Sequence, residues 1–253
     1  MRTLLIVANW KMNHTIEDSI KFITHLKKAL LLGKKSDIVL CPSFTSLYPL
    51  AMALQESETP FIKLGAQNCH YENTGAYTGE ISPVFLKEVE CSYVLVGHSE
   101  RRHIFGETDE WIGKKVSSVL KHDMNPILCV GETLLEHEKN KTMSIITHQL
   151  TKGLELVSKE EAVHLTIAYE PVWAIGTGHN ASPEQAEEVH AQIRGWLETR
   201  FDKTVAANIR ILYGGSVKSD NAKDLTKQPN IDGLLVGGAS LTVDSFSQIV
   251  NDS

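Results

Sequence analysis

The sequence predicts an α/β protein whose chain closes into a (β/α)8 barrel, a single domain over residues 1–253. Eight short apolar runs recur along it, and they are too continuous for strands that expose one face to water. Amphipathic segments lie between these runs, and no Pro-, Ser- or Gly-rich linker divides the chain. Alternating strands and helices form a parallel sheet, and eight units suggest closure. The alternative is an open doubly wound sheet, but no Gly-rich dinucleotide turn follows the first run.

The apolar runs define the expected strands in order. They are LLIVANW (4–10), DIVLC (37–41), FIKLGAQ (61–67), YVLVG (93–97), PILCVG (126–131), LTIAYE (165–170), IRILYGG (209–215) and GLLVGG (233–238). The expected helices cover about 16–31, 108–122, 140–154 and 182–201, with a shorter one near 244–250. The helix over 182–201 has the clearest start, because Ser182 is a good N-cap, Pro183 suits the first helical position and Gln185 completes a capping box.

Composition excludes several classes of function. A net charge of −6 argues against nucleic acid as a partner, because phosphate backbones require a basic surface. No run approaches the roughly 18 apolar residues of a membrane span. The N-terminal run lacks a cleavage pattern, and the four cysteines have no zinc spacing, so a reduced, cytoplasmic protein is expected. No metal motif, P-loop or dinucleotide fingerprint is present, so the sequence predicts no metal and no cofactor.

In barrels of this kind, function lies on the loops that follow the strands. The first strand ends at Asn9 and Lys11, which share a face with the strand's inward residues, so both side chains are expected at the barrel mouth. The fourth ends at His98, where Ser99 could cap a short helix. The positive potential of that helix terminus should keep the imidazole neutral. Taken alone, Lys11 is better explained as an ordinary surface lysine, and His98 is at least as well explained as a structural histidine.

Two further strand ends carry carboxylates. Glu132 follows the fifth run and Glu170 the sixth, and an apolar setting should raise the pKa of such a group and make it a useful base. The last two strands end in the glycine pairs of YGGS (213–216) and VGG (236–238), where barrels commonly bind phosphate through backbone N–H groups. Together with Lys11 and His98, these ends predict proton transfer on a small phosphorylated molecule.

Six ordered motifs identify a family. ANWKMN, GAYTGEIS, VGHSERR, AYEPVWAIGTG, YGGS and GLLVGGASL together resemble the triosephosphate isomerases, from Leu4 to the end of the chain. The resemblance implies a TIM barrel and an isomerase of glycolysis and gluconeogenesis. Such an enzyme interconverts dihydroxyacetone phosphate and D-glyceraldehyde 3-phosphate through an enediolate, without a cofactor.

The resemblance also implies catalytic roles. Glu170 resembles the base that moves a proton between C1 and C2, and His98 resembles the electrophile that polarises the carbonyl, the glutamate and neutral histidine pair for which this family is known. Lys11 resembles the cation that binds substrate, and Asn9 its neighbour in the oxyanion site.

Further residues are implied in binding and support. Backbone N–H groups for the phosphate would come from Gly176, Ser216, Gly237 and Gly238. The supporting contacts would be Glu100 with Lys11, Glu132 with the indole of Trp173, and the Tyr213 hydroxyl with a closed lid. The lid is the apolar segment 172–178, in which Ile175 would press on Glu170 and exclude water from it.

The long segment 68–82 implies a homodimer. By itself it reads as a surface Ω-loop, but in the resembling family it inserts into a second subunit, with the residue at Thr78 approaching Asn9 and His98 of the partner. The alternative function is a phosphate-binding barrel with a different or lost activity. Intact Lys11, His98 and Glu170 argue against loss, and neither a late Schiff-base lysine nor clustered metal ligands favours another barrel chemistry.

Overall fold

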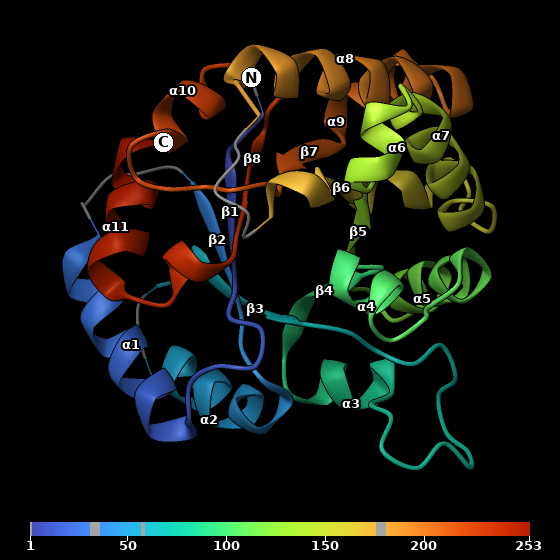
Figure 1. Ribbon diagram of the computed structural model, residues 1–253. Coiled ribbons are helices and arrows are strands. Elements are labelled where there is room, and N and C mark those ends of the chain that lie inside the picture. Colours follow the sequence, from blue (N-terminus) through green and yellow to red (C-terminus); the bar gives the residue numbers. More distant parts are fainter. Residues whose placement is uncertain (1, 31–35, 57–58, 176–180) are drawn as a thin grey trace.

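The computed structural model describes residues 2–30, 36–56, 59–175 and 181–253. Its centre is a closed barrel of parallel strands in the order β1 to β8, in which β8 pairs with β1 (Figure 1). The strands are β1 (Leu5–Asn9), β2 (Asp37–Cys41), β3 (Ile62–Ala66), β4 (Cys91–Val96), β5 (Asn125–Val130), β6 (Thr166–Tyr169), β7 (Arg210–Tyr213) and β8 (Gly233–Val236). The (β/α)8 barrel expected from the sequence is confirmed, and the open doubly wound sheet is wrong.

Helices form an outer layer around the barrel and follow every strand (Figure 1). They are α1 (Ile16–Ala29), α2 (Phe44–Gln55), α3 (Pro83–Glu88), α4 (Ser99–His103), α5 (Asp109–Lys121), α6 (Leu134–Glu138), α7 (Thr142–Gly153), α8 (Pro183–Arg200), α9 (Lys203–Asn208), α10 (Ala222–Thr226) and α11 (Val243–Asp252). Short 3-10 turns are η1 (Glu161–His164), η2 (Val172–Ala174) and η3 (Gly238–Ser240). The five helices expected from the sequence are present, with ends that differ by at most two residues.

Side chains fill the barrel and the layer around it. Alternation along each strand sends one set of side chains inward, and these form one buried cluster: Leu5, Val7, Val39, Cys41, Tyr93, Leu95, Ile127, Cys129, Ala168, Leu212 and Leu235. The interior is tight, because a Cβ on Gly65 of β3 would lie 2.6 Å from the sulfur of Cys41. The other set packs against the helices in a larger core. A filled barrel leaves only its rims for chemistry.

Two local features expected from the sequence are present in the structure. The capping box of Ser182 and Gln185 is formed, so α8 begins where the sequence predicted. Between β3 and α3 the chain makes a long excursion that extends away from the barrel at the lower right of Figure 1. This excursion is the segment that the sequence marked as a loop.

Candidate active site

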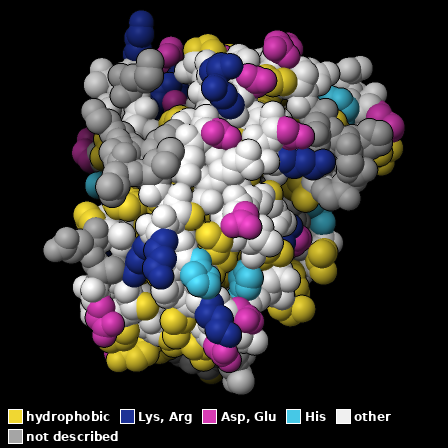
Figure 2. All heavy atoms as spheres, turned by 90° about the vertical axis from the view of Figure 1, so that its left-hand side faces the viewer, with side chains coloured by type: hydrophobic (Ala, Val, Ile, Leu, Met, Phe, Trp, Pro, Cys, Tyr) yellow, Lys and Arg dark blue, Asp and Glu magenta, His cyan; other side chains and the backbone are white. Residues whose placement is uncertain are grey.

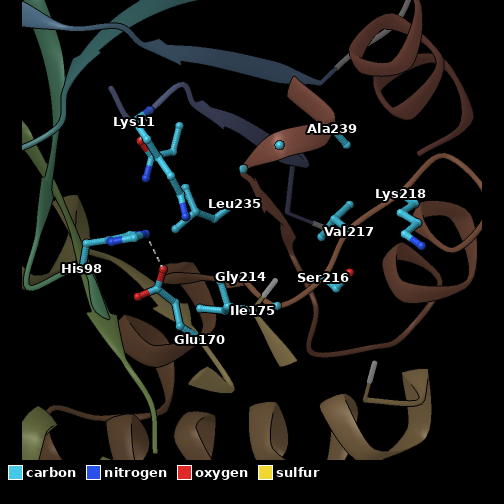
Figure 3. Close-up of a pocket in the computed structure, with 14 residues that line it drawn as sticks. Lys11, His98, Glu170, Ile175, Gly214, Ser216, Val217, Lys218, Leu235 and Ala239 are labelled. Carbon is cyan, nitrogen blue, oxygen red and sulfur yellow. Dashed lines mark hydrogen bonds and ion pairs between the residues drawn. The ribbon is translucent and has the colours of Figure 1, made fainter. Parts of the chain in front are cut away.

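A pocket of about 370 Å³ opens at the ends of the strands (Figure 3). Its lining comes from the ends of β1, β4, β6, β7 and β8, so that residues far apart in sequence converge. The lining residues are Asn9, Lys11, His98, Glu170, Ile175, Gly214, Gly215, Ser216, Val217, Lys218, Leu235, Gly237, Gly238 and Ala239. Every described residue that the sequence assigned to catalysis or substrate binding is therefore in one cavity. Gly176 lies outside the described residues.

Lys11 enters this pocket from an uncommon backbone conformation. Its φ is +52°, a region that non-glycine residues rarely adopt without support. Support comes from Gln67, whose amide nitrogen donates to the carbonyl oxygens of Lys11 at 2.7 Å and Cys41 at 3.0 Å. The Lys11 ammonium lies 2.6 Å from a carboxylate oxygen of Glu100, which is the pairing that the resemblance implied. The strained backbone conformation of Lys11 thus directs its ammonium group into the pocket.

Asn9 is fixed beside Lys11 by a backbone contact. Its side-chain oxygen accepts a hydrogen bond of 3.0 Å from the Lys11 N–H, and the residue is only 5% exposed. With the oxygen engaged, the side chain offers its NH2 group as a donor to the pocket. Asn9 and Lys11 therefore present donors and positive charge to any oxygen that enters.

His98 is held in a defined tautomer. Its Nδ1 accepts a hydrogen bond of 3.2 Å from the Glu100 N–H, so in the neutral ring the proton resides on Nε2. Nε2 points into the pocket and lies 3.0 Å from Oε1 of Glu170 (Figure 3). His98 itself is the N-cap of α4, so the suggestion that Ser99 caps this helix is wrong. The histidine can donate a proton or a hydrogen bond to a bound oxygen.

Glu170 is almost completely buried, with 2% of its surface exposed. One carboxylate oxygen meets His98, and the other accepts a hydrogen bond of 2.9 Å from the Ser99 N–H. Gly214 lies against it, since a Cβ there would be 3.0 Å from the Glu170 Cγ. The carboxylate is thus held at the wall of the pocket by groups that a ligand oxygen could replace.

The two groups set each other's titration. Burial of Glu170 raises its pKa, but the charge and hydrogen bond of His98, together with the Ser99 N–H, outweigh burial and lower the pKa of Glu170 below its ordinary value. Burial lowers the pKa of His98, but the charge and hydrogen bond of Glu170 raise it above its ordinary value. Both directions oppose the sequence-based expectations of a raised glutamate pKa and a histidine kept neutral by its helix. The direct contact between the two groups is the reason.

The opposite wall of the pocket is built from glycine-rich backbone. Ser216, Gly237 and Gly238 lie on it, and a Cβ on Gly237 would be 3.6 Å from Cε of Lys11. Small residues keep backbone groups accessible next to a cation, which is a combination that suits an anion. Lys218 adds a second positive charge to the lining, and no strand-end rule had singled it out.

A second layer of contacts surrounds Glu132. This carboxylate is fully buried, and one oxygen accepts hydrogen bonds from the Trp173 indole at 2.8 Å and the Tyr169 hydroxyl at 3.2 Å. The contact with Trp173 is the one that the resemblance implied. His137, which sequence reasoning missed, stacks on Trp173 with ring centroids 4.6 Å apart and places Nδ1 3.3 Å from Glu132. Trp173, near the start of the predicted lid, is therefore anchored on two sides.

Tyr213 reaches the other end of the predicted lid. Burial raises the pKa of its hydroxyl to about 12, while the nearby backbone of Ala181 opposes the shift. Gly215 makes room for this hydroxyl, since a Cβ there would lie 2.2 Å from it. Ala181 is the first described residue after 176–180, so residues 176–178 of the predicted lid lie outside the described residues, whereas 172–175 are described. Within the lid, Trp173 is held by Glu132, and after the lid the backbone of Ala181 lies near the Tyr213 hydroxyl.

Comparison with known proteins agrees with this geometry. The family model described as triosephosphate isomerase matches residues 4–253. The chain belongs to the triosephosphate isomerase family. Triosephosphate isomerases of Dictyoglomus turgidum and Carboxydothermus hydrogenoformans are 50% identical over 250 residues and 49% identical over 253 residues. The first alignment covers 99% of both chains, and the second covers both completely. The triosephosphate isomerase of Clostridium botulinum is 47% identical over 251 residues, 99% of this chain and all of its own. The resemblance stated from sequence, and with it the isomerase class, is confirmed.

Other classes of site find no support in what the structure describes. Within the described residues, no group of three or more His, Cys, Asp or Glu side chains is placed to hold a metal ion. Among those same residues, no helix is long and apolar enough to cross a membrane. On the face shown in Figure 2, Lys and Arg side chains lie among Asp and Glu side chains instead of forming a basic stripe. Among the described residues, the pocket at the strand ends brings together the buried base, the histidine and the lysine described above.

Proposed function

We propose that the protein interconverts dihydroxyacetone phosphate and D-glyceraldehyde 3-phosphate, the isomerisation shared by glycolysis and gluconeogenesis. The observation that carries this proposal is the convergence of Glu170, His98 and Lys11 in one 370 Å³ pocket with a glycine-built wall. A triose phosphate needs a base for its carbon acid, donors for its oxygens and an anion site for its phosphate. The pocket offers all three within reach of one another.

The proton transfer follows from these positions. Glu170 takes a proton from C1 of dihydroxyacetone phosphate, and the electrons of the C–H bond move into an enediolate. The same carboxyl returns a proton at C2, which gives the aldehyde. For this, the carboxylate exchanges its contacts with Ser99 N–H and His98 for the substrate. Release from these contacts also removes the groups that lower its pKa, so the buried base becomes stronger as the substrate binds.

His98 and Lys11 act on the substrate oxygens. The Nε2–H of His98 donates to the carbonyl oxygen and then moves protons between the two enediolate oxygens, and its Nδ1 stays fixed by the Glu100 N–H. Lys11 and Asn9 stabilise the negative charge that develops on those oxygens. Ser216, Gly237 and Gly238, with Gly176 of the lid, hold the phosphate through backbone N–H groups. Ile175 lines the pocket beside Glu170 and excludes water from the base.

We further propose that the protein works as a cytoplasmic homodimer. Large apolar side chains are exposed near the mouth and on the 68–82 loop: Met12 (96%), Tyr77 (44%), Ile104 (73%) and Phe105 (65%). Exposed apolar side chains of this kind are what a second subunit would cover. Thr78 is exposed on the same loop and would reach the Asn9 and His98 of a second copy.

The proposal is tested by turnover of EDTA-treated protein. D-glyceraldehyde 3-phosphate is supplied, and the dihydroxyacetone phosphate formed is measured with a coupled dehydrogenase. We expect kcat/KM near the diffusional ceiling of about 10⁸ M⁻¹s⁻¹, where this family is known to work, and a fall of about 10²–10⁴-fold in Glu170→Gln. Folded wild-type protein that binds phosphoglycolate without turnover would instead support a binding barrel.

A further inference from the structure

The seam between β4 and β5 opens just below the active site. The two strands pair through Leu95 with Ile127 and Val96 with Leu128, but β4 then ends and the chain turns at Gly97, whose φ is +71°. β5 continues beside β6, where the Glu170 N–H donates to the Val130 carbonyl at 2.8 Å. Residues of a strand direct their backbone groups alternately to opposite neighbours. Gly131 therefore faces the side that β4 has left.

Gln149 of α7 takes the place of the missing strand there. Its side-chain oxygen accepts a hydrogen bond of 2.8 Å from the Gly131 N–H, and its side-chain nitrogen donates to the Gly131 carbonyl at 3.1 Å. The amide thus satisfies both backbone groups of one residue, as a neighbouring strand would. Gln149 is 7% exposed and does not line the pocket. Its two hydrogen bonds are its visible task.

Arg102 closes the adjoining part of the same seam. Its guanidinium donates to the carbonyl of Gly97 at 2.7 Å and to that of Cys129 at 3.1 Å, so it links the end of β4 to β5 directly. Two side chains therefore replace the backbone ladder over the last residues before the site.

The seam lies between the two halves of the catalytic pair. His98 and the Ser99 N–H stand on the β4 side, whereas Glu170 follows β6, whose end is hydrogen-bonded to β5. Gly131 packs directly on the backbone of Glu170, because a Cβ there would lie 1.8 Å from the Glu170 carbonyl oxygen. Any movement of Gly131 away from β4 therefore carries the backbone of Glu170 with it.

We propose that Gln149 is a positioning residue for the reaction. By its two hydrogen bonds to the backbone of Gly131, it fixes the spacing between His98 and Glu170 from outside the pocket. The proposal rests on the proposed roles of those two residues. A shift of about 1 Å in a catalytic group can cost about 10²-fold in rate. The loss should appear in kcat, because Gln149 is remote from the phosphate-binding wall.

The first test compares Gln149→Met with a matched variant on the same helix. Gln149→Met keeps the length of the side chain and removes both hydrogen bonds. Leu150→Val shortens the neighbouring buried side chain and leaves the two hydrogen bonds of Gln149 intact. We expect kcat to fall at least tenfold in Gln149→Met, with KM and phosphoglycolate affinity within about threefold of wild type. Leu150→Val should keep the wild-type kcat. A kcat within twofold of wild type in Gln149→Met overturns the proposal.

The second test uses a readout that loss of packing does not move. In Gln149→Glu, the introduced carboxyl can replace both hydrogen bonds only when protonated, because an ionised carboxylate repels the Gly131 carbonyl. Burial raises the pKa of such a group into the assay range. We therefore expect kcat of Gln149→Glu to rise as pH falls, whereas that of wild type does not. A profile parallel to wild type overturns the proposal, and this test stands even if Gln149→Met fails to fold.

The unchanged neighbours of Gln149 and the variant Glu170→Gln serve as controls for these two tests. Charged and titratable groups around this seam include His98, Arg102, Asp109, Cys129, Glu132, His148, Tyr169 and Glu170, and all are unchanged in both variants. Turnover retained in Glu170→Gln would overturn the proposed function itself. An inactive Glu170→Gln beside a fully active Gln149→Met would overturn only the role of Gln149.

Discussion

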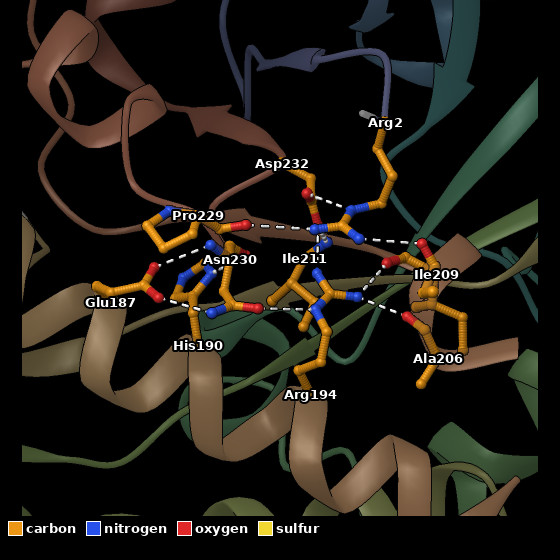
Figure 4. Close-up of polar contacts among 11 residues, drawn as sticks. Arg2, Glu187, His190, Arg194, Ala206, Ile209, Ile211, Pro229, Asn230 and Asp232 are labelled. Atoms are coloured by element: carbon orange, nitrogen blue, oxygen red, sulfur yellow. Dashed lines mark hydrogen bonds and ion pairs between the residues drawn. The ribbon is translucent and has the colours of Figure 1, made fainter. Parts of the chain in front are cut away.

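The two ends of the barrel bury similar charged groups and use them differently. At the amino ends of the strands, Arg194 donates to Asp232 at 2.5 Å and to the carbonyls of Ala206 at 2.6 Å and Ile209 at 2.8 Å (Figure 4). Asp232 is bound on its other oxygen by Arg2. Each oxygen of this carboxylate therefore has an arginine partner within the protein.

At the carboxyl ends, Glu170 and His98 are equally buried, but their contact faces a 370 Å³ cavity (Figure 3). A ligand can take the place of either partner. The comparison teaches that burial alone does not show whether a charged group stabilises the fold or takes part in function. A charged group that borders an unfilled cavity can exchange its protein partner for a ligand, and one enclosed by protein cannot.

Breaking the closed network should give the largest effect. In Arg194→Leu, Asp232 loses an ion pair and the carbonyls of Ala206 and Ile209 lose their donor. We expect a loss of about 3–5 kcal/mol in the free energy of unfolding, measured in urea, because a buried carboxylate is left partly uncompensated. The activity per folded molecule should stay at the wild-type level.

Arg194→Lys provides the intermediate case. It keeps the charge for Asp232 but cannot span the two carbonyls, so its stability should lie between that of wild type and that of Arg194→Leu. Wild-type stability in Arg194→Leu, or a kcat that falls with stability across the pair, would show that the two ends are not separable.

Shortening the base should produce the converse result. In Glu170→Asp the carboxylate retreats by about one carbon–carbon bond, and we expect turnover to fall by about 10²-fold. The melting temperature should move by no more than roughly 2 °C, since the charge stays within reach of His98. Steady-state kinetics and thermal unfolding of the same preparation check both statements. An unchanged rate would remove Glu170 from the mechanism.

The fold was predictable because most of its signals are local. All eight strands are buried on both faces, so each appears as an apolar run, and the long helices carry clear periodicity. α2 was not anticipated, because Pro49 lies within it and a proline normally marks the end of a helix. α3, α4, α6 and α10 have five or six residues, too few to show a periodic pattern.

The site was predictable in its membership and not in its electrostatics. Strand ends point to Lys11, His98 and Glu170, whereas the directions of the pKa shifts of His98 and Glu170 depend on a 3.0 Å contact between residues that follow different strands. Gln67 could have been found by the same rule, because it follows β3 directly. Gln149 could not, since it lies mid-helix and acts through a turn that β4 makes far away in sequence.

A matched pair of glycine variants separates phosphate binding from packing at the carboxyl ends of the strands. In Gly238→Ala the new methyl group meets no atom within 4 Å, whereas in Gly215→Ala it would lie 2.2 Å from the Tyr213 hydroxyl. We expect Gly238→Ala to keep wild-type stability and to bind phosphoglycolate about tenfold more weakly, about 1.4 kcal/mol, because the methyl crowds a phosphate-binding N–H. Calorimetric titration measures the affinity.

Gly215→Ala should instead lower stability, because the hydroxyl of Tyr213 has no space to move within its buried site. Equal phosphoglycolate affinity in Gly238→Ala and wild type would argue against a phosphate site at Gly238. Equal stability of the two variants would argue against the packing described for Tyr213.

The smallest effect is a shift in titration without loss of structure. Glu170 raises the pKa of His98 by its charge and hydrogen bond, while burial acts in the opposite direction. Removal of the charge in Glu170→Gln leaves burial and the positive charge of Lys11 to dominate, so the pKa of His98 should fall. Histidine ring signals followed by NMR across pH 4–9 measure it in ligand-free protein.

Glu187→Gln is the control from the closed end, where Glu187 accepts hydrogen bonds from the backbone and side chain of Asn230. It removes one negative charge from the chain without touching the mouth, so His98 should titrate as in wild type. If Glu170→Gln also leaves the His98 titration unchanged, the contact between the two residues does not govern their protonation. The carboxyl end of the barrel would then differ from the amino end only in that its charged groups are accessible to a ligand. The proposal that Glu170 becomes a stronger base when substrate binds would have to be abandoned.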